Sequence, residues 1–331
     1  MSSPLRIAVV GLDHWYAAIP FAEQVARRDD TILAAVVDRD PARASEIAGR
    51  LGCERVETDP GAVIEDSSID AIACFTSVDQ NAELCKAAAR AGKHIVSVKP
   101  LAMTMAEADA VVDAVEESGV VFIPSESRRT SPLAAALSSW VHGGRLGELR
   151  SGAFAMNSSL PKAWPGESGA GWWIDPRRTP GGAWIDHAVY QIDRMRWLFG
   201  SEVVGTTGVV STIAHTGLPV EDYGHAVFTL ASGAVVTVED TWVSSPGGFS
   251  NRGHLVGSEG SVFYDSTTGM LGWSFDGEPW THRALPSDTF DTLDALVDAV
   301  QSDTTPLVSV RDARATLSAS LRFYSAAATV G

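Results

Sequence analysis

Short apolar runs alternate with helical stretches through the first part of the chain. Five runs, residues 5–10, 32–37, 71–75, 94–98 and 120–123, are nearly continuous in apolar residues, which is typical of strands buried on both faces. Thr104 and Glu107 form a capping box whose helix ends before Gly119, and Asp40-Pro41 begins another helix. Such alternation predicts a parallel sheet with right-handed crossovers, whose ligands bind at the carboxyl ends of the strands.

After about residue 145 the pattern changes to an alternation of apolar and polar positions. Residues 149–156, 226–230 and 234–243 have this period of two, and the Ala-Ser-Gly turn at 231–233 predicts a hairpin. Residues 158–182 are rich in Gly, Pro and Trp without a period, which is typical of a functional loop. Two amphipathic segments, 290–300 and 311–324, predict closing helices.

The length of 331 residues suits two domains. We predict an α/β domain with a parallel sheet at residues 1–124 and an α+β domain with an open, mainly antiparallel sheet at residues 125–331.

Charge and cysteine content narrow the possible partners. The chain has 25 Lys and Arg against 41 Asp and Glu, a net charge of −16, and its basic residues cluster only as isolated pairs, which argues against nucleic-acid binding. Cys53, Cys74 and Cys85 lack a CxxC spacing and fit a reducing compartment. Neither a signal peptide nor a membrane span is evident, so we expect a cytoplasmic protein without a membrane partner.

The turn after the first apolar run is a candidate cofactor site. Gly11, Leu12, Asp13, His14 and Trp15 stand where a G-x-G-x-x-G fingerprint would stand, although only the first glycine is present. The N–H groups that open the following helix attract a phosphate group. Asp13 adds bulk and negative charge there, so either the turn is displaced outward or Asp13 points elsewhere. An ordinary strand-to-helix turn is the alternative.

Asp38 ends the second run and favours NAD over NADP. A carboxylate there accepts both ribose hydroxyls of an adenosine and repels a 2′-phosphate, although the neighbouring Arg39 could bind that phosphate. The alternative role for Asp38 is that of a capping residue. Further cofactor candidates follow the later runs: Phe75, Thr76, Ser77, Lys99 and Pro100.

A helix opens with Gly181-Gly182 and ends at Gly200. Asp186, Tyr190 and Asp193 are four and three residues apart and share one polar face. That face meets either a specific partner or only water. In the parallel sheet, Lys99 is held extended by Pro100, and it either reaches into a cleft or lies on the surface.

These residues together resemble the glucose-fructose oxidoreductase and inositol dehydrogenase (Gfo/Idh/MocA) family. The resemblance rests on the Gly11 turn, Asp38, Val98-Lys99-Pro100 and the Gly-Gly-x-x-x-Asp-x-x-x-Tyr-x-x-Asp helix, and their order covers nearly the whole chain. It implies a Rossmann domain, an open antiparallel sheet domain, and a nicotinamide cofactor between them. It also implies oxidation or reduction of a sugar, cyclitol or related polyol or keto compound by a homo-oligomer, a dimer or tetramer.

The resemblance also assigns roles. Lys99 matches the lysine of a Glu-Lys-Pro motif, with Val98 in place of Glu; Asp186 matches a substrate-side aspartate; and Tyr190 stands where many members have histidine. Lys99, Tyr190 and His187 are all eligible as proton carrier. We expect Lys99 to lead, with burial lowering its pKa. Arg129 is an expected substrate contact. So are Trp172, Trp173 and Asp175 of the irregular loop, which suit stacking on and gripping a sugar ring; the alternative for the tryptophans is a place in the core.

Two other functions stay open: a redox-assisted glycosidase that regenerates its nicotinamide, and a non-catalytic NAD-binding regulatory protein, against which Lys99 argues. The histidines have no recognised ligand spacing, so we expect no metal site. A serine hydrolase is not supported, because no G-x-S-x-G motif occurs.

Overall fold

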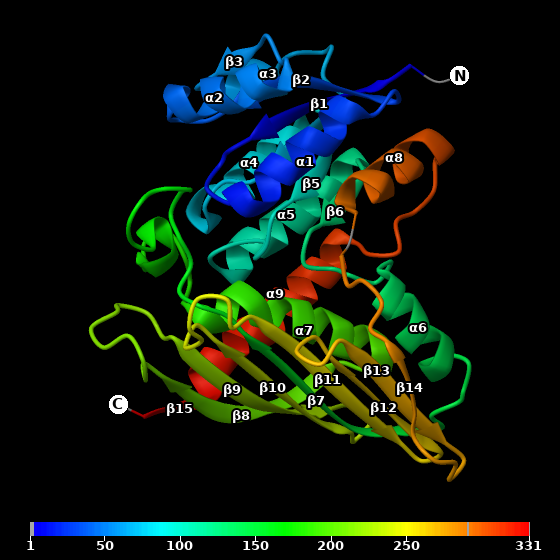
Figure 1. The fold of residues 1–331 in the computed structure, drawn as a ribbon. Helices are drawn as coiled ribbons and strands as arrows, with labels where there is room; N and C mark the ends of the chain where they lie inside the picture. Colours follow the sequence, from blue (N-terminus) through cyan, green and yellow to red (C-terminus); the bar gives the residue numbers. More distant parts are fainter. Residues whose placement is uncertain (1–2, 290, 331) are drawn as a thin grey trace.

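Two sheets dominate the computed structural model, which describes residues 3–289 and 291–330 (Figure 1). A six-stranded parallel sheet forms the N-terminal part, and a nine-stranded, mostly antiparallel sheet forms the C-terminal part. This confirms the predicted fold class. The boundary after residue 124 stays a prediction. In the described part of the chain, no helix is both long and apolar enough to cross a membrane.

The first sheet has the order β3-β2-β1-β4-β5-β6, with all neighbouring strands parallel. Its strands are β1 (Leu5–Val10), β2 (Thr31–Val37), β3 (Val56–Glu57), β4 (Ala71–Cys74), β5 (His94–Ser97) and β6 (Phe122–Pro124). The chain leaves β1 toward β2 on one side and later returns to β4 on the other. This change of direction opens a crevice at the carboxyl ends of β1 and β4, where ligands of such sheets bind.

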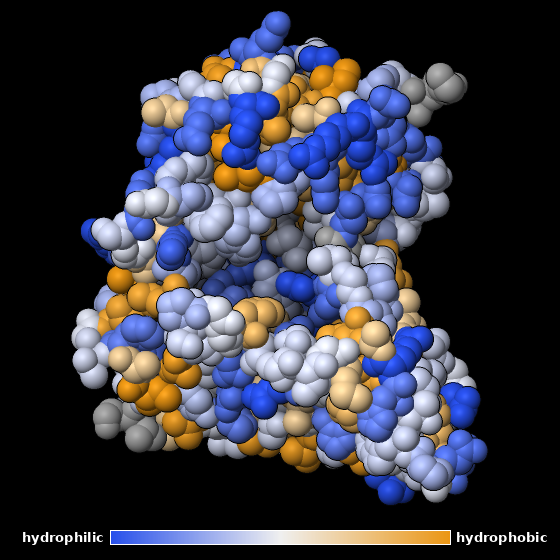
Figure 2. Space-filling view, in the orientation of Figure 1, coloured by the Kyte–Doolittle hydropathy of each residue, from blue (hydrophilic) through white to orange (hydrophobic). Residues whose placement is uncertain are grey.

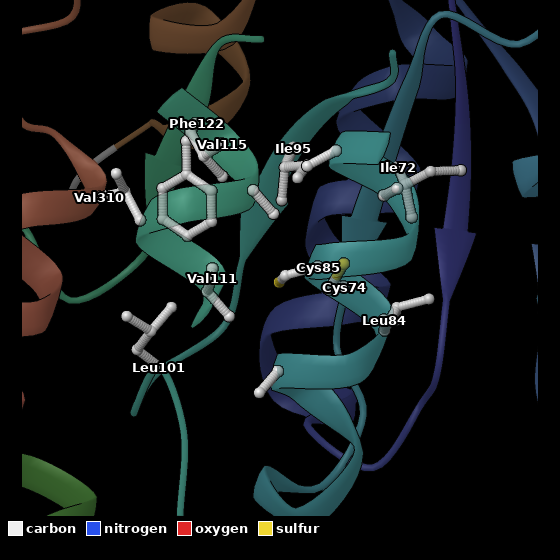
Figure 3. Packing of buried hydrophobic residues seen from close by; sticks show 14 of the residues in the cluster. Ile72, Cys74, Leu84, Cys85, Ile95, Leu101, Val111, Val115, Phe122 and Val310 are labelled. Carbon is white, nitrogen blue, oxygen red and sulfur yellow. The ribbon is translucent and has the colours of Figure 1, made fainter. Parts of the chain in front are cut away.

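Helices cover both faces of this sheet: α1 (Trp15–Arg27), α2 (Pro41–Leu51), α3 (Gly61–Ile64), α4 (Val78–Arg90) and α5 (Met105–Ser118). Asp40 caps α2, and the capping box of Thr104 and Glu107 begins α5, as predicted. Figure 3 shows Cys74 and Cys85 among the apolar side chains between β4, α4 and α5. Both thiols are buried and unoxidised, so they serve here as small packing residues.

The second sheet has the order β14-β13-β12-β11-β7-β10-β9-β8-β15, in which only the pairs β7 with β10 and β8 with β15 are parallel among the described strands. Its strands are β7 (Leu149–Asn157), β8 (Val203–Ser211), β9 (Tyr223–Leu230), β10 (Val235–Thr241), β11 (Ser250–Gly257), β12 (Gly260–Asp265), β13 (Met270–Phe275), β14 (Thr281–Ala284) and β15 (Ala327–Val330).

Two helices, α7 (Ala183–Phe199) and α9 (Val310–Ala326), lie between the two sheets (Figure 1). The helix predicted to open with Gly181-Gly182 and to end at Gly200 is therefore confirmed as α7. Two further helices, α6 (Pro132–Val141) and α8 (Thr292–Ser302), lie at the side of the molecule. The first closing helix was expected from Phe290, which lies outside the described residues.

The irregular segment from residue 158 to 182, here called the strap, leaves β7 and returns to α7. Within the part of the chain that the structure describes, its helical content is one short 3₁₀ turn, η1 (Gly171–Ile174), and Ser159 makes an isolated antiparallel bridge to Val243. The strap crosses to the first domain, where Glu167 pairs with Arg43 at 2.6 Å and the carbonyl of Lys162 accepts a hydrogen bond from Trp15 Nε1 at 3.0 Å. It therefore joins the second sheet to the turn that follows β1.

Candidate active site

Lys99 and Asp186 form a buried ion pair between the two domains. Lys99 follows β5 at the carboxyl edge of the first sheet and is 1 % exposed, whereas Asp186 lies in the first turn of α7. Lys99 Nζ donates to a carboxylate oxygen of Asp186 and, at 2.5 Å, to its backbone carbonyl. The structure thus brings together the lysine and the aspartate that the sequence had placed 87 residues apart.

Aromatic and imidazole groups surround the pair. Trp242 Nε1 donates to Asp186 Oδ2 at 3.0 Å, and His187 Nε2 lies 3.3 Å from the same oxygen. The ring centroids of Trp173 and Tyr190 lie 5.3 and 5.4 Å from Lys99 Nζ. The carboxylate therefore has donors on both oxygens, and the ammonium lies against two aromatic rings.

The pair is charged at neutral pH. Burial alone would lower the pKa of Lys99, but the charge of Asp186 and the neighbouring Tyr16 and Tyr190 outweigh it and raise that pKa well above its usual range. Burial would raise the pKa of Asp186, yet His187, Lys99 and Trp242 bring it down to about 2. Our expectation that burial lowers the pKa of Lys99 is therefore wrong, because the buried carboxylate is its direct partner. Lys99 is therefore a charged hydrogen-bond donor.

His187 supplies an unprotonated nitrogen beside the pair. Burial, assisted by the charges of Lys99 and Arg128, lowers the pKa of His187 to about 4 despite the opposing effect of Asp186. The imidazole is thus neutral, and its Nε2 carries the hydrogen because it faces a carboxylate. Nδ1 is left as a buried acceptor with no hydrogen-bond partner among the described residues.

The turn after β1 is built for a close approach of backbone. Gly11 has φ +84°, and a side chain there would come within 2.6–2.8 Å of Thr76, so only glycine fits. Asp38 closes the turn by accepting the Leu12 N–H at 2.7 Å and the Asp40 N–H at 2.8 Å. Helix α1 then begins at Trp15, with its N-terminus at the crevice of the first sheet.

The side chain of Asp13 is held by donors from the first domain and from the strap. Its carboxylate accepts hydrogen bonds from Arg39 at 2.9 Å, from Arg178 of the strap at 3.2 Å, and from the N–H of Ser77 at 3.0 Å. Two guanidinium groups therefore offset its charge. Together with Gly11 and the helix N-terminus, this arrangement fits a dinucleotide.

Two expected substrate contacts are engaged elsewhere. Arg129 pairs with Asp193 at 2.6 Å and with Asp312 at 2.8 Å, and these carboxylates already compensate its charge. Asp175 holds Arg177 at 2.7 Å on the strap. The structure gives Arg129 and Asp175 these ion-pair partners and no contact with the Lys99–Asp186 pair, and their contact with substrate stays a prediction.

Trp172 and Trp173 stack on each other with ring centroids 4.0 Å apart, and both are buried. Trp172 Nε1 donates to the carbonyl of Asp13 at 3.2 Å. Both rings also contact His14, at 4.7 and 4.8 Å between centroids. The strap thus packs directly on the turn after β1.

A cleft of about 320 Å³ lies beside this cluster and between the domains. Figure 2 shows the molecule hollowed between its two halves. The cleft is lined in part by Phe75 and Tyr190, which the sequence predicted as site residues, and by Val98 next to Lys99. Tyr16 and Arg128 also line it and were not predicted from the sequence. Trp242 was also missed, since nothing local distinguishes it from a core residue. No group of three or more metal-binding side chains converges in residues 3–289 and 291–330.

Comparison with known proteins identifies the family of both domains. Residues 5–125 match the family model described as an oxidoreductase family with an NAD-binding Rossmann fold, and residues 134–263 match the C-terminal domain of the same family. The chain belongs to the Gfo/Idh/MocA family. The resemblance found in the sequence is thereby confirmed, and the first domain of this family member is its Rossmann domain.

Among curated relatives, this Gfo/Idh/MocA chain is similar to myo-inositol 2-dehydrogenase of Thermotoga maritima, with 28% identity over 79% of this chain and 75% of that protein. It is also similar to scyllo-inositol 2-dehydrogenase (NAD(+)) of Bacillus subtilis, with 27% identity over 95% and 91%. The structure of a levoglucosan dehydrogenase in complex with NADH has the same fold, with a TM-score of 0.86, 21% identity, and coverage of 98% of this chain and 97% of that one.

Proposed function

We propose that this protein is an NAD-dependent dehydrogenase that transfers a hydride between the nicotinamide and a secondary alcohol carbon of a sugar, cyclitol or related polyol. The observation that carries the proposal is the buried Lys99–Asp186 pair, which joins the edge of the Rossmann sheet to α7 beside the dinucleotide turn. The inositol dehydrogenases similar to this chain support the substrate class.

NAD is the preferred cofactor in this proposal. Asp38 presents a buried carboxylate at the end of β2, whose oxygens accept the Leu12 and Asp40 N–H groups and keep further lone pairs that would accept the ribose hydroxyls, while its charge would repel a 2′-phosphate. Arg39, the residue that could favour NADP, has its guanidinium held by Asp13 at 2.9 Å. The charge that would meet a 2′-phosphate is therefore already paired.

Lys99, His187 and Asp186 have separate roles in the proposed oxidation. The nicotinamide, when bound, supplies the hydride acceptor. Lys99 donates hydrogen bonds from a charged ammonium to the reacting oxygen and stabilises the negative charge that develops there. His187 Nδ1 is assigned the hydroxyl proton, because it is an unprotonated, buried acceptor that has no partner among the described residues. Asp186 fixes both groups by accepting from Lys99 and holding His187 Nε2.

Cofactor and substrate assays test the proposal. Purified protein is titrated with NAD and NADP by calorimetry and then followed at the NADH absorbance with a panel of polyols and sugars. We expect tighter binding of NAD and net NADH formation with at least one polyol. Glycoside cleavage without net NADH would instead support the internal redox cycle, and NAD binding without any turnover would support a regulatory protein. Near-wild-type turnover by Lys99→Ala would exclude the assigned role of Lys99.

A further inference from the structure

Among the buried polar atoms that lack a partner within the part of the chain that the structure describes are His14 Nε2 and Trp173 Nε1, both on rings near Lys99. Buried side-chain donors and acceptors are usually paired, so each exception needs an explanation. His14 comes from the dinucleotide turn and is fully buried, and Trp173 comes from the strap and is 4 % exposed. The mechanism proposed above uses neither atom.

His14 presents a hydrogen-bond acceptor. Its Nδ1 lies 2.9 Å from the carbonyl oxygen of Thr76, which can only accept, so Nδ1 carries the hydrogen. Burial, assisted by the charge of Lys99, lowers the pKa of His14 to about 3. The imidazole is therefore neutral, and its Nε2 has a free lone pair.

Trp173 presents a hydrogen-bond donor beside that acceptor. The indole N–H can only donate, and the neighbouring Trp172 donates its own N–H to the Asp13 carbonyl. The rings of His14 and Trp173 meet edge to face with centroids 4.8 Å apart, and Lys99 Nζ lies 5.3 Å from the Trp173 ring. Within the described chain, a ring with an unpartnered donor thus packs against a ring with an unpartnered acceptor, beside the reactive ammonium.

We propose that Trp173 Nε1 and His14 Nε2 bind one hydroxyl group of the polyol substrate, adjacent to the hydroxyl held by Lys99. The hydroxyl oxygen accepts from Trp173, and its hydrogen is donated to His14. A hydroxyl satisfies both atoms at once, whereas a carbonyl would satisfy only the indole. The half-exposed ring of Tyr16 lies 6.0 Å from both rings and also lines the cleft, so the subsite lies behind a residue of the cleft wall.

This inference rests on the proposed function and has a matched pair of variants. Trp173→Phe keeps a large ring and removes the free N–H, while Trp172→Phe removes an N–H that is already bonded within the protein. For Trp173→Phe we expect the KM for the polyol to rise about tenfold, as for the loss of one hydrogen bond to substrate. The affinity of Trp173→Phe for NAD stays at the wild-type value. Its unfolding midpoint falls only by the amount that replacing a tryptophan ring with a phenyl ring causes in both variants. Trp172→Phe lowers the unfolding midpoint further, because the Asp13 carbonyl loses its donor.

The variant His14→Asn tests the proposed hydroxyl subsite independently. The Asn amide reaches the position of Nδ1 and keeps the bond to Thr76, but nothing replaces Nε2. We expect the same rise in KM as for Trp173→Phe, and no further rise in the double variant, since both atoms hold one hydroxyl. A deoxy analogue that is a poor substrate for the wild type should lose that disadvantage in both variants.

The outcomes separate the two proposals. A wild type that binds NAD but oxidises no polyol ends the proposed function and this inference together. An active wild type with an unchanged KM in Trp173→Phe ends only the inference. A fall in unfolding midpoint for Trp173→Phe as large as for Trp172→Phe would show that its N–H is bonded within the protein and would also overturn it. So would a loss confined to NAD affinity, which would assign the hydroxyl to the cofactor ribose.

Discussion

Replacing Lys99 with methionine tests the central ion pair through stability rather than activity. The change removes one charge of a pair whose side chains are 1 % and 6 % exposed and leaves the Asp186 carboxylate buried. Breaking such a pair costs about 3–5 kcal/mol. The carboxylate keeps the N–H of Trp242 at 3.0 Å and the neighbouring His187, which places the expected loss at the lower end. We expect the free energy of unfolding at pH 7 to fall by about 3 kcal/mol.

The double variant Lys99→Met with Asp186→Leu is the matched control, because it removes both charges and fills the space with apolar atoms. Replacing a whole buried pair in this way is often close to neutral, so the double variant should recover most of the lost stability while both variants stay inactive. Urea unfolding followed by tryptophan fluorescence measures each free energy. A loss below about 1 kcal/mol for Lys99→Met, or a double variant no more stable than the single one, would refute the reasoning.

The pH dependence of stability gives a second test of the Lys99→Met variant. In the wild type the folded-state pKa of Asp186, about 2, lies below its unfolded value. Its contribution to stability is therefore complete above about pH 4 and is lost as the pH falls toward 2. Without Lys99, burial raises that pKa above the unfolded value, so protonation stabilises the variant. The deficit of Lys99→Met relative to the wild type should shrink between pH 7 and pH 4.

Three further outcomes follow from the site. His187→Gln keeps a donor toward Asp186 but has no base at Nδ1, so kcat for alcohol oxidation at saturating NAD should fall by about 10²–10⁴; an unchanged kcat would move the proton to Tyr190. Asp38→Asn should shift the ratio of NAD to NADP affinity toward NADP by about tenfold in calorimetric titrations, since the charge that repels a 2′-phosphate is gone. Burial raises the pKa of Glu126 to about 8. Stability is therefore lost as the pH rises from the unfolded pKa toward 8, and Glu126→Gln should remove this loss and unfold at higher urea than the wild type at pH 9.

Much of the first domain could be predicted because its signals are local. A capping residue and the helix that it begins lie within four positions, as Asp40 and Thr104 show. The strands β11 to β13 were missed because their alternation is broken by glycines. Gly253 lies under the Tyr264 ring and Gly272 under the Phe263 ring, where a side chain would come within 2.2–2.3 Å. Such pairing of a glycine with an aromatic residue on the next strand depends on register.

In the candidate site, too, local features could be predicted from the sequence and long-range contacts could not. Motif order placed Lys99 and Asp186 in one site, but the direction of the Lys99 pKa depended on a contact 87 residues away. Arg129 was interpreted as a substrate residue because its neighbours resembled a motif. Its partner Asp312 is 183 residues away and leaves no trace in the local pattern. The identity of a side chain is thus readable from sequence, whereas the group that neutralises it is set by the fold.

The Arg129 ion pairs also bear on how the two halves of the site meet. Arg129 follows β6 of the first sheet, and its guanidinium is shared by Asp193 on α7 and Asp312 on α9. A hinge motion between the sheets would have to break these largely buried contacts in every catalytic cycle. Lys99 and Asp186 are therefore aligned once, during folding, and do not have to be realigned each time ligands exchange.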